Sequence, residues 1–163
     1  MSFTAATRIG VLVTVALSLE MLFLGLTTTL KRRDLQVVRV EALSPHVRRI
    51  TLGGDALEGF VSASFDDHIK LVLDLGADES VRRDYTPRHF DPVARELVME
   101  FALHGDGPAA TWAAQAVPGQ RATIAGPRGS FIIPMDYDWH LLVGDDSALP
   151  AIARRSEEHT SEL

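Results

Sequence analysis

The chain has 163 residues, of which 46% are hydrophobic and 23% are charged, a composition typical of one globular domain rather than a disordered segment. It contains no cysteine, which excludes disulfides and thiolate metal sites. The formal net charge of -6 argues against a nucleic acid partner, because phosphate binding needs a basic face. The spacing of the histidines predicts no metal-ligand cluster, and Asp66, Asp67 and His68 are expected to form a solvated turn before a strand.

The first predicted element is an apolar segment, residues 9–30, in which Glu20 is the one ionisable residue. Its length is sufficient to span a bilayer as a helix. Arg8 precedes it and the basic residues 31–33 follow it, so the positive-inside rule would keep the rest of the chain in the cytoplasm. We therefore expect residues 1–33 to be either a membrane anchor on a cytoplasmic protein or upstream sequence read from a misplaced start.

Short strands dominate residues 34–137. The predicted strands are rich in β-branched residues or alternate polar and apolar side chains, with turn residues between them. One helix, Ala109–Ala116, is expected after Pro108, which suits a first helical turn, and it ends before Pro118 and Gly119. The pattern predicts a mainly β fold, a small Greek-key antiparallel barrel. The predicted strands are 35–41, 46–52, 68–74, 84–88, 96–103, 121–125 and 130–133.

A second unit is expected to begin near Asp138, over residues 138–154. Residues 139–143 form a predicted strand, Gly144–Asp146 a turn, and a helix follows. This order is typical of the start of an α/β nucleotide-binding domain. Residues 155–163 lack apolar periodicity and are interpreted either as the translation of a sequencing adapter or as an ordinary polar tail.

Arg83, Tyr85 and Thr86 lie on one predicted strand, where Arg83 and Tyr85 share a face. A flavin dinucleotide needs a cation at its pyrophosphate, an aromatic group against its ring and a hydroxyl near the ring nitrogen that takes hydride. Taken alone, the same residues also fit an ordinary edge strand. Residues 105–111 form a glycine-containing turn that enters the predicted helix, either as a phosphate site at the helix N-terminus or as a plain turn. His104 is either a structural residue or a cofactor contact.

Five motifs follow one another in a fixed order, and this order carries more weight than any one of them. They are Asp66–Leu71, Arg83–Arg88, Phe101–Ala109, Gly126–Ser130 and Gly144–Ala151. With this order the chain resembles the siderophore-interacting proteins, which are FAD-dependent ferric-siderophore reductases of the ferredoxin-reductase-like superfamily. The resemblance implies a six-stranded antiparallel barrel holding FAD, followed by an α/β domain holding NAD(P)H. Electrons would pass from NAD(P)H through FAD to a ferric siderophore, from which iron(II) is released.

The resemblance also implies roles for single residues. Arg83 would contact a phosphate of FAD, Tyr85 would pack on the isoalloxazine, and Thr86 would bond near its reactive nitrogen. The turn from Gly107 to Thr111 would receive the pyrophosphate. The complete implied cofactor-binding set is Arg83, Tyr85, Thr86, His104, Gly107, Ala109, Ala110 and Thr111.

Two features depart from the family pattern. A serine is common where Ala110 stands, so one phosphate hydrogen bond would be missing or would come from Thr111. Almost all of the nicotinamide domain is lacking, and with it the basic surface thought to receive the siderophore. We therefore expect the chain alone to be inactive. The alternatives are another FAD-dependent NAD(P)H reductase with a different acceptor and a non-catalytic flavin-binding fragment.

Overall fold

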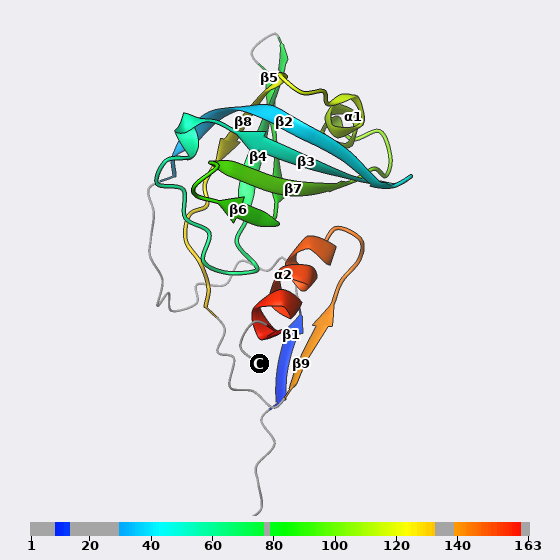
Figure 1. Cartoon of the computed structure of the whole chain (residues 1–163). Coiled ribbons are helices and arrows are strands. Elements are labelled where there is room, and N and C mark those ends of the chain that lie inside the picture. Colours follow the sequence, from blue (N-terminus) through cyan, green and yellow to red (C-terminus); the bar gives the residue numbers. More distant parts are fainter. Residues whose placement is uncertain (1–8, 14–29, 77–78, 133–138, 161–163) are drawn as a thin grey trace, which may run out of the picture.

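A computed structural model describes residues 9–13, 30–76, 79–132 and 139–160 (Figure 1). One sheet of seven strands forms the main body, and every strand pair in it is antiparallel. Its strands stand in the order β5-β4-β8-β2-β3-β7-β6. They are β2 (Arg32–Ser44), β3 (Val47–Gly53), β4 (Ile69–Gly76), β5 (Glu79–Tyr85), β6 (His89–Asp91), β7 (Glu96–Ala102) and β8 (Arg121–Ala125).

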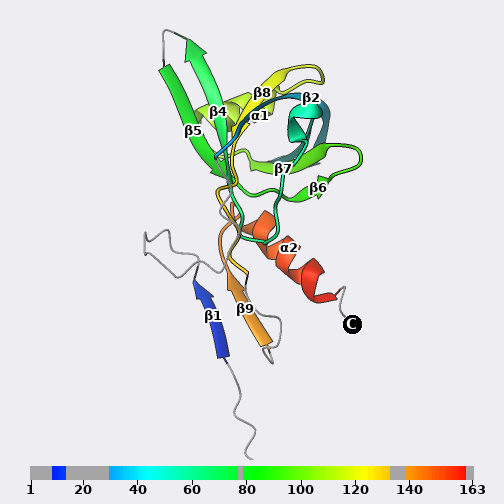
Figure 2. The ribbon, with the colours of Figure 1, turned by 90° about the vertical axis from the view of Figure 1, so that its left-hand side faces the viewer.

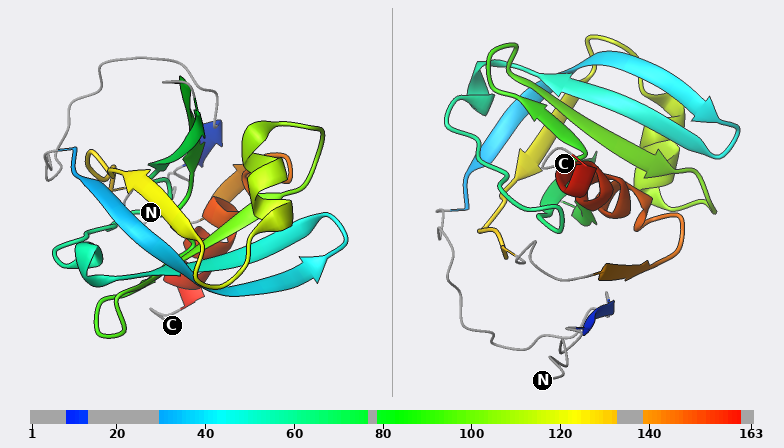
Figure 3. Two further views of the ribbon diagram at one scale, coloured as in Figure 1. Left: turned by 90° about the horizontal axis from the view of Figure 1, so that it is seen from above. Right: turned by 60° about the horizontal axis from the view of Figure 1, so that its bottom comes forward.

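The sheet curves around its own core (Figure 3). Across the core, the ring of Tyr85 on the edge strand β5 packs on that of Phe101 on β7, the neighbour of the other edge strand β6, with centroids 4.4 Å apart. β8 is the strand between β4 and β2 and is hydrogen-bonded to both. The antiparallel barrel predicted from the sequence is therefore confirmed, and it has seven strands where the family resemblance implied six.

Alternation of side chains explains the core. Residues at every second position of β4 and β7 are buried, as the period of a strand requires. Each fully buried Leu, Ile or Phe side chain stabilises the fold by about 1.5–3 kcal/mol. The central buried residues are Leu35, Val37, Ile50, Leu52, Ile69, Leu71, Leu97, Met99, Phe101 and Ile124.

Helix α1 (Pro108–Gln115) closes one side of the barrel, with Ala109 and Ala113 buried against it. Pro108 opens the helix, where its missing N–H would have had no intrahelical partner. The predicted helix is thus confirmed to within one residue at each end. The 3-10 turn η1 (Asp55–Leu57) adds the buried side chain of Leu57 to the core.

The predicted strand and helix after the barrel also form. β9 (Trp139–Val143) is followed by α2 (Leu149–Thr160), and both lie below the barrel (Figures 1 and 2). α2 runs through residues 155–160, which the sequence suggested were either adapter-derived or a polar tail. The side chain of Arg155 is buried against the ring of Phe65.

The apolar N-terminal segment was predicted as a helix, but Ile9–Val13 form strand β1, which pairs in parallel with β9. β-branched side chains at alternate positions favour a strand there. The rest of that segment, except Leu30, lies outside the described residues. Among the residues that the structure describes, no helix is long and apolar enough to cross a membrane.

Two predicted strands differ from the structure: one is shifted along the sequence, and the other is not formed by residues 130–132. The strand expected at residues 84–88 is β5, which ends at Tyr85 because Pro87 has no N–H to donate to a ladder. Residues 130–132 are not a strand, and Ile133 lies outside the described residues. The buried hydroxyl of Ser130 bonds instead to Asp67 and to the backbone N–H of Ala63, which holds this segment as a loop.

Candidate flavin site

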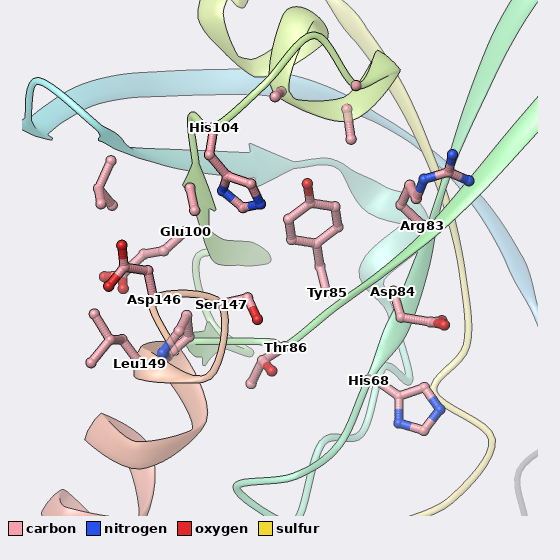
Figure 4. Close-up of a pocket in the computed structure, with 16 residues that line it drawn as sticks. His68, Arg83, Asp84, Tyr85, Thr86, Glu100, His104, Asp146, Ser147 and Leu149 are labelled. Carbon is pink, nitrogen blue, oxygen red and sulfur yellow. The ribbon is translucent and has the colours of Figure 1, made fainter. Parts of the chain in front are cut away.

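One pocket of about 380 Å³ collects almost all of the predicted site (Figure 4). It lies between the end of β5, the end of β7, the start of α1 and the turn before α2. Thr111 is the exception, since it does not line the pocket and its N–H makes the first helical bond, to the carbonyl of Gly107 at 2.9 Å. The predicted residues that line it are Arg83, Tyr85, Thr86, His104, Gly107, Ala109 and Ala110.

The register of β5 places Arg83 and Tyr85 on the side of the strand that faces the core. They pair with Leu71 and Ile69, which are fully buried, and cross-strand partners share a face. Burial raises the pKa of Tyr85, against a smaller opposite effect of the Arg83 charge. The guanidinium of Arg83 is exposed and donates to the carbonyl of Arg82 at 2.9 Å. The pocket therefore has an aromatic ring and an exposed cation on one strand.

The start of α1 offers backbone donors to the same pocket. Gly107 is the extended N-cap residue, and no side chain caps the helix. Since the first N–H groups of a helix have no intrahelical partner, those of Ala109 and Ala110 are available to an anion. A Cβ on Gly107 would meet no atom within 4 Å, so a ligand can approach the backbone closely here. Together with Arg83, this helix end suits a phosphate group.

The sequence did not predict the opposite wall. Asp146, Ser147, Leu149 and Pro150, from the turn and first residues of α2, face the barrel residues across the pocket (Figure 4). The side chain of Asp145 accepts hydrogen bonds from the hydroxyl and the backbone N–H of Ser147, and these bonds lower the pKa of its carboxyl. Only the fold brings this turn to the pocket.

Glu100 is another lining residue that the sequence did not single out. Its carboxylate accepts two hydrogen bonds from the guanidinium of Arg49, at 2.6 and 3.0 Å. These residues face each other on β3 and β7. The pairing offsets the negative charge of Glu100, which would otherwise repel a phosphate in the pocket.

Asp67 was expected in a solvated turn, but it is buried, with 2% of its surface exposed. Its Oδ2 accepts hydrogen bonds from the hydroxyls of Ser62 and Ser130, at 2.9 and 2.8 Å, and from the backbone N–H of Ser64 at 3.1 Å. A buried carboxylate is stable only with such donors. It joins the loop before β4 to the loop after β8, and His68 beside it lines the pocket.

Comparison with known proteins identifies the family. The profile of the siderophore-interacting FAD-binding domain matches residues 36–80 and 74–131, more than half of the chain. The chain belongs to this siderophore-interacting family. The resemblance drawn from the ordered motifs is thereby confirmed.

Named relatives of this siderophore-interacting chain agree with the match. It is 43% identical over 146 residues to the NADPH-dependent ferric-chelate reductase of Escherichia coli (strain K12), covering 78% of the chain and 57% of that protein. It is 33% identical over 149 residues to the ferric vibriobactin reductase ViuB of Vibrio cholerae, covering 80% and 55%. The chain thus spans little more than half the length of these relatives.

A solved structure supports the fold of this family member. The siderophore utilization protein from T. fusca is 38% identical and superposes with a TM-score of 0.76, covering 82% of this chain and 58% of that chain. The match includes more residues than the family profile does, so the similarity extends beyond the profile's 36–131 range.

Proposed function

We propose that this chain is the flavin-binding part of a ferric-siderophore reductase, a cytoplasmic enzyme in which electrons pass from NAD(P)H through FAD to iron(III). The observation that carries the proposal is the single pocket that holds Arg83, Tyr85 and the uncapped start of α1. The names of the relatives, a ferric-chelate reductase and a ferric vibriobactin reductase, supply the substrate class.

The pocket residues fit FAD in chemistry. Arg83 and the N–H groups of Ala109 and Ala110 would hold the pyrophosphate by charge-assisted hydrogen bonds. The ring of Tyr85, backed by Phe101, would lie against the isoalloxazine. The hydroxyl of Thr86 would bond at the nitrogen that takes hydride, and His104 would contact the cofactor at the pocket rim.

Bound FAD would supply the step between a two-electron donor and a one-electron acceptor. The residues of this chain would orient it and exclude water from one of its faces. Iron(III) is a hard cation that oxygen chelators bind tightly, whereas iron(II) is held far more weakly, so reduction releases the metal.

We assign residues 34–137 to the FAD barrel and 138–154 to the start of the NAD(P)H domain, whose first helix, α2, continues to Thr160. β9 and α2 supply only the beginning of that domain, and the side chains of Trp139, Leu141 and Val143 are exposed. Holding the nicotinamide against the flavin accounts for about 7–11 kcal/mol of barrier lowering in reactions of this kind. Chain 1–163 alone should therefore not release iron from ferric siderophores with NADPH, as measured with a ferrous-iron chelator. Iron release at a rate typical of an enzyme would contradict this assignment.

The flavin site is tested by titrating FAD into chain 1–163 and its variants and following flavin fluorescence. Arg83→Met should weaken binding about tenfold or more, since hydrogen bonds between charged groups contribute about 1.5–3 kcal/mol. Arg82→Met is the matched control, because Arg82 is exposed on the same strand, points to the other face and does not line the pocket. Equal FAD affinities for the two variants would contradict the site.

A further inference from the structure

Arg154 on α2 contacts two loops of the barrel. One nitrogen of its guanidinium, Nη1, donates to the carbonyl of Pro87 at 2.8 Å and to the hydroxyl of Ser62 at 3.0 Å. Burial lowers the pKa of Arg154, and the negative charge of Asp67 opposes that shift. Pro87 is itself buried and directly follows Thr86, which lines the flavin pocket. A half-buried arginine from the second unit thus holds the backbone next to a pocket residue.

The contact continues into a chain of hydrogen bonds. Ser62 accepts from Arg154 and donates its own proton to Oδ2 of Asp67 at 2.9 Å. The same carboxylate oxygen accepts from Ser130 at 2.8 Å. The cation and the buried anion are therefore linked through one hydroxyl, and the link ties α2 to three barrel segments. These segments are the loop before β4, the connection from β5 to β6 and the loop after β8.

We propose that Arg154 is a positioning residue that couples the second unit, β9 and α2, to the flavin pocket of the barrel through the backbone next to Thr86. The inference rests on the proposed function, because it concerns the pocket assigned to FAD. Arg154 belongs to the helix whose first residues, Leu149 and Pro150, line the pocket, and it anchors the carbonyl beside Thr86 on the facing wall. Any shift of α2 would thus move both walls together.

Arginine suits this position better than lysine. A single guanidinium nitrogen serves two acceptors here while the planar group stays in one orientation. A lysine ammonium keeps the charge but is more strongly hydrated and lacks the rigid planar fork. Arg154→Lys should therefore keep part of the contact between α2 and the backbone beside Thr86, whereas Arg154→Met should remove that contact.

The test uses FAD-loaded chain 1–163 and measures three quantities: FAD affinity, the midpoint potential of the bound flavin, and thermal unfolding of the apo chain. Arg154→Met should weaken FAD binding by up to about tenfold, because displacing Thr86 would cost one hydrogen bond of about 0.5–1.5 kcal/mol to the cofactor, and it should shift the potential of the bound flavin. Arg154→Lys and Ser62→Ala should give smaller changes in the same direction. Arg121→Met, at an exposed arginine outside the flavin pocket, should change neither the FAD affinity nor the midpoint potential.

The potential separates positioning from a merely structural role. A lower unfolding temperature for Arg154→Met with wild-type affinity and potential would overturn the inference and leave the proposed function intact. If Arg154→Met does not fold, wild-type affinity and potential in both Arg154→Lys and Ser62→Ala would overturn it equally. If the wild-type chain itself does not bind FAD, the proposed function fails and the inference fails with it.

Discussion

Replacing Asp67 with alanine should destabilise the barrel by about 3 kcal/mol. Three donors bond to its Oδ2, and each hydrogen bond to a charged group contributes about 1.5–3 kcal/mol. The sum is an upper bound, because burying a carboxylate costs several kcal/mol and the hydroxyls of Ser62 and Ser130 can rotate toward other acceptors. The backbone N–H of Ser64 cannot rotate and would stay buried without its partner. After these opposing effects, Asp67→Ala should lower the free energy of unfolding by about 2–5 kcal/mol, a range that includes the value of about 3 kcal/mol given above.

Urea unfolding of chain 1–163, followed by circular dichroism, measures this loss as a lower midpoint at an unchanged slope. Asp67→Asn keeps an oxygen acceptor of the same size and should lose only about 1–2 kcal/mol. Asp34→Ala is the control, because the exposed Asp34 accepts one hydrogen bond, from Thr123 at 2.7 Å. It should cost less than about 1 kcal/mol. An Asp67→Ala chain within about 0.5 kcal/mol of wild type, the range of ordinary surface changes, would refute the reasoning.

Three further outcomes are expected. In flavin fluorescence titrations Tyr85→Phe should bind FAD nearly as wild type does, whereas Tyr85→Ala should bind it about tenfold more weakly. Aromatic pairs contribute about 0.5–1.5 kcal/mol beyond the energy of the contact area that they bury. Equal affinities of the two variants would contradict the stacking role. Ala110→Ser should tighten FAD binding about fivefold by adding one hydrogen bond of about 1 kcal/mol, and weaker binding would show that the pyrophosphate lies elsewhere. Hydrogen bonds from the N–H groups of Ala94 and Val93 lower the pKa of Asp91, so its contribution to stability is present above the ordinary carboxyl pKa and is lost as pH falls through the lowered one. An NMR titration of Asp91 should show the low pKa, and an ordinary midpoint would contradict it.

The sequence predicted the features that depend on local patterns. The alternation in residues 68–74 predicted β4, and Pro108 with the alanines after it predicted α1. The pocket residues were predicted as a group because the ordered motifs resemble one family, and the structure brings seven of the eight together. Thr111 does not line the pocket, so its role at the cofactor stays a prediction.

Features that depend on distant contacts were not predicted. Only one residue in the first half of β5 is apolar, so no alternation marks its start. Its backbone bonds to β4 determine the strand. The local sequence around Asp67 is typical of a solvated turn, because its partner Ser130 comes from the distant loop after β8. The wall formed by Asp146 and Ser147 depends on how α2 packs below the barrel, which no local pattern encodes.

The place of β8 within the sheet determines when the barrel can form during synthesis. β8 stands between β4 and β2, and it is the last of the seven strands to leave the ribosome. Until residues 121–125 emerge, the nascent chain holds the β4–β5 hairpin and the β2-β3-β7-β6 group as two separate pieces, each with an open edge. Pairings over such long sequence separations, Asp34 with Thr123 for example, slow folding and expose strand edges. Newly made chains therefore expose these strand edges until β8 closes the sheet.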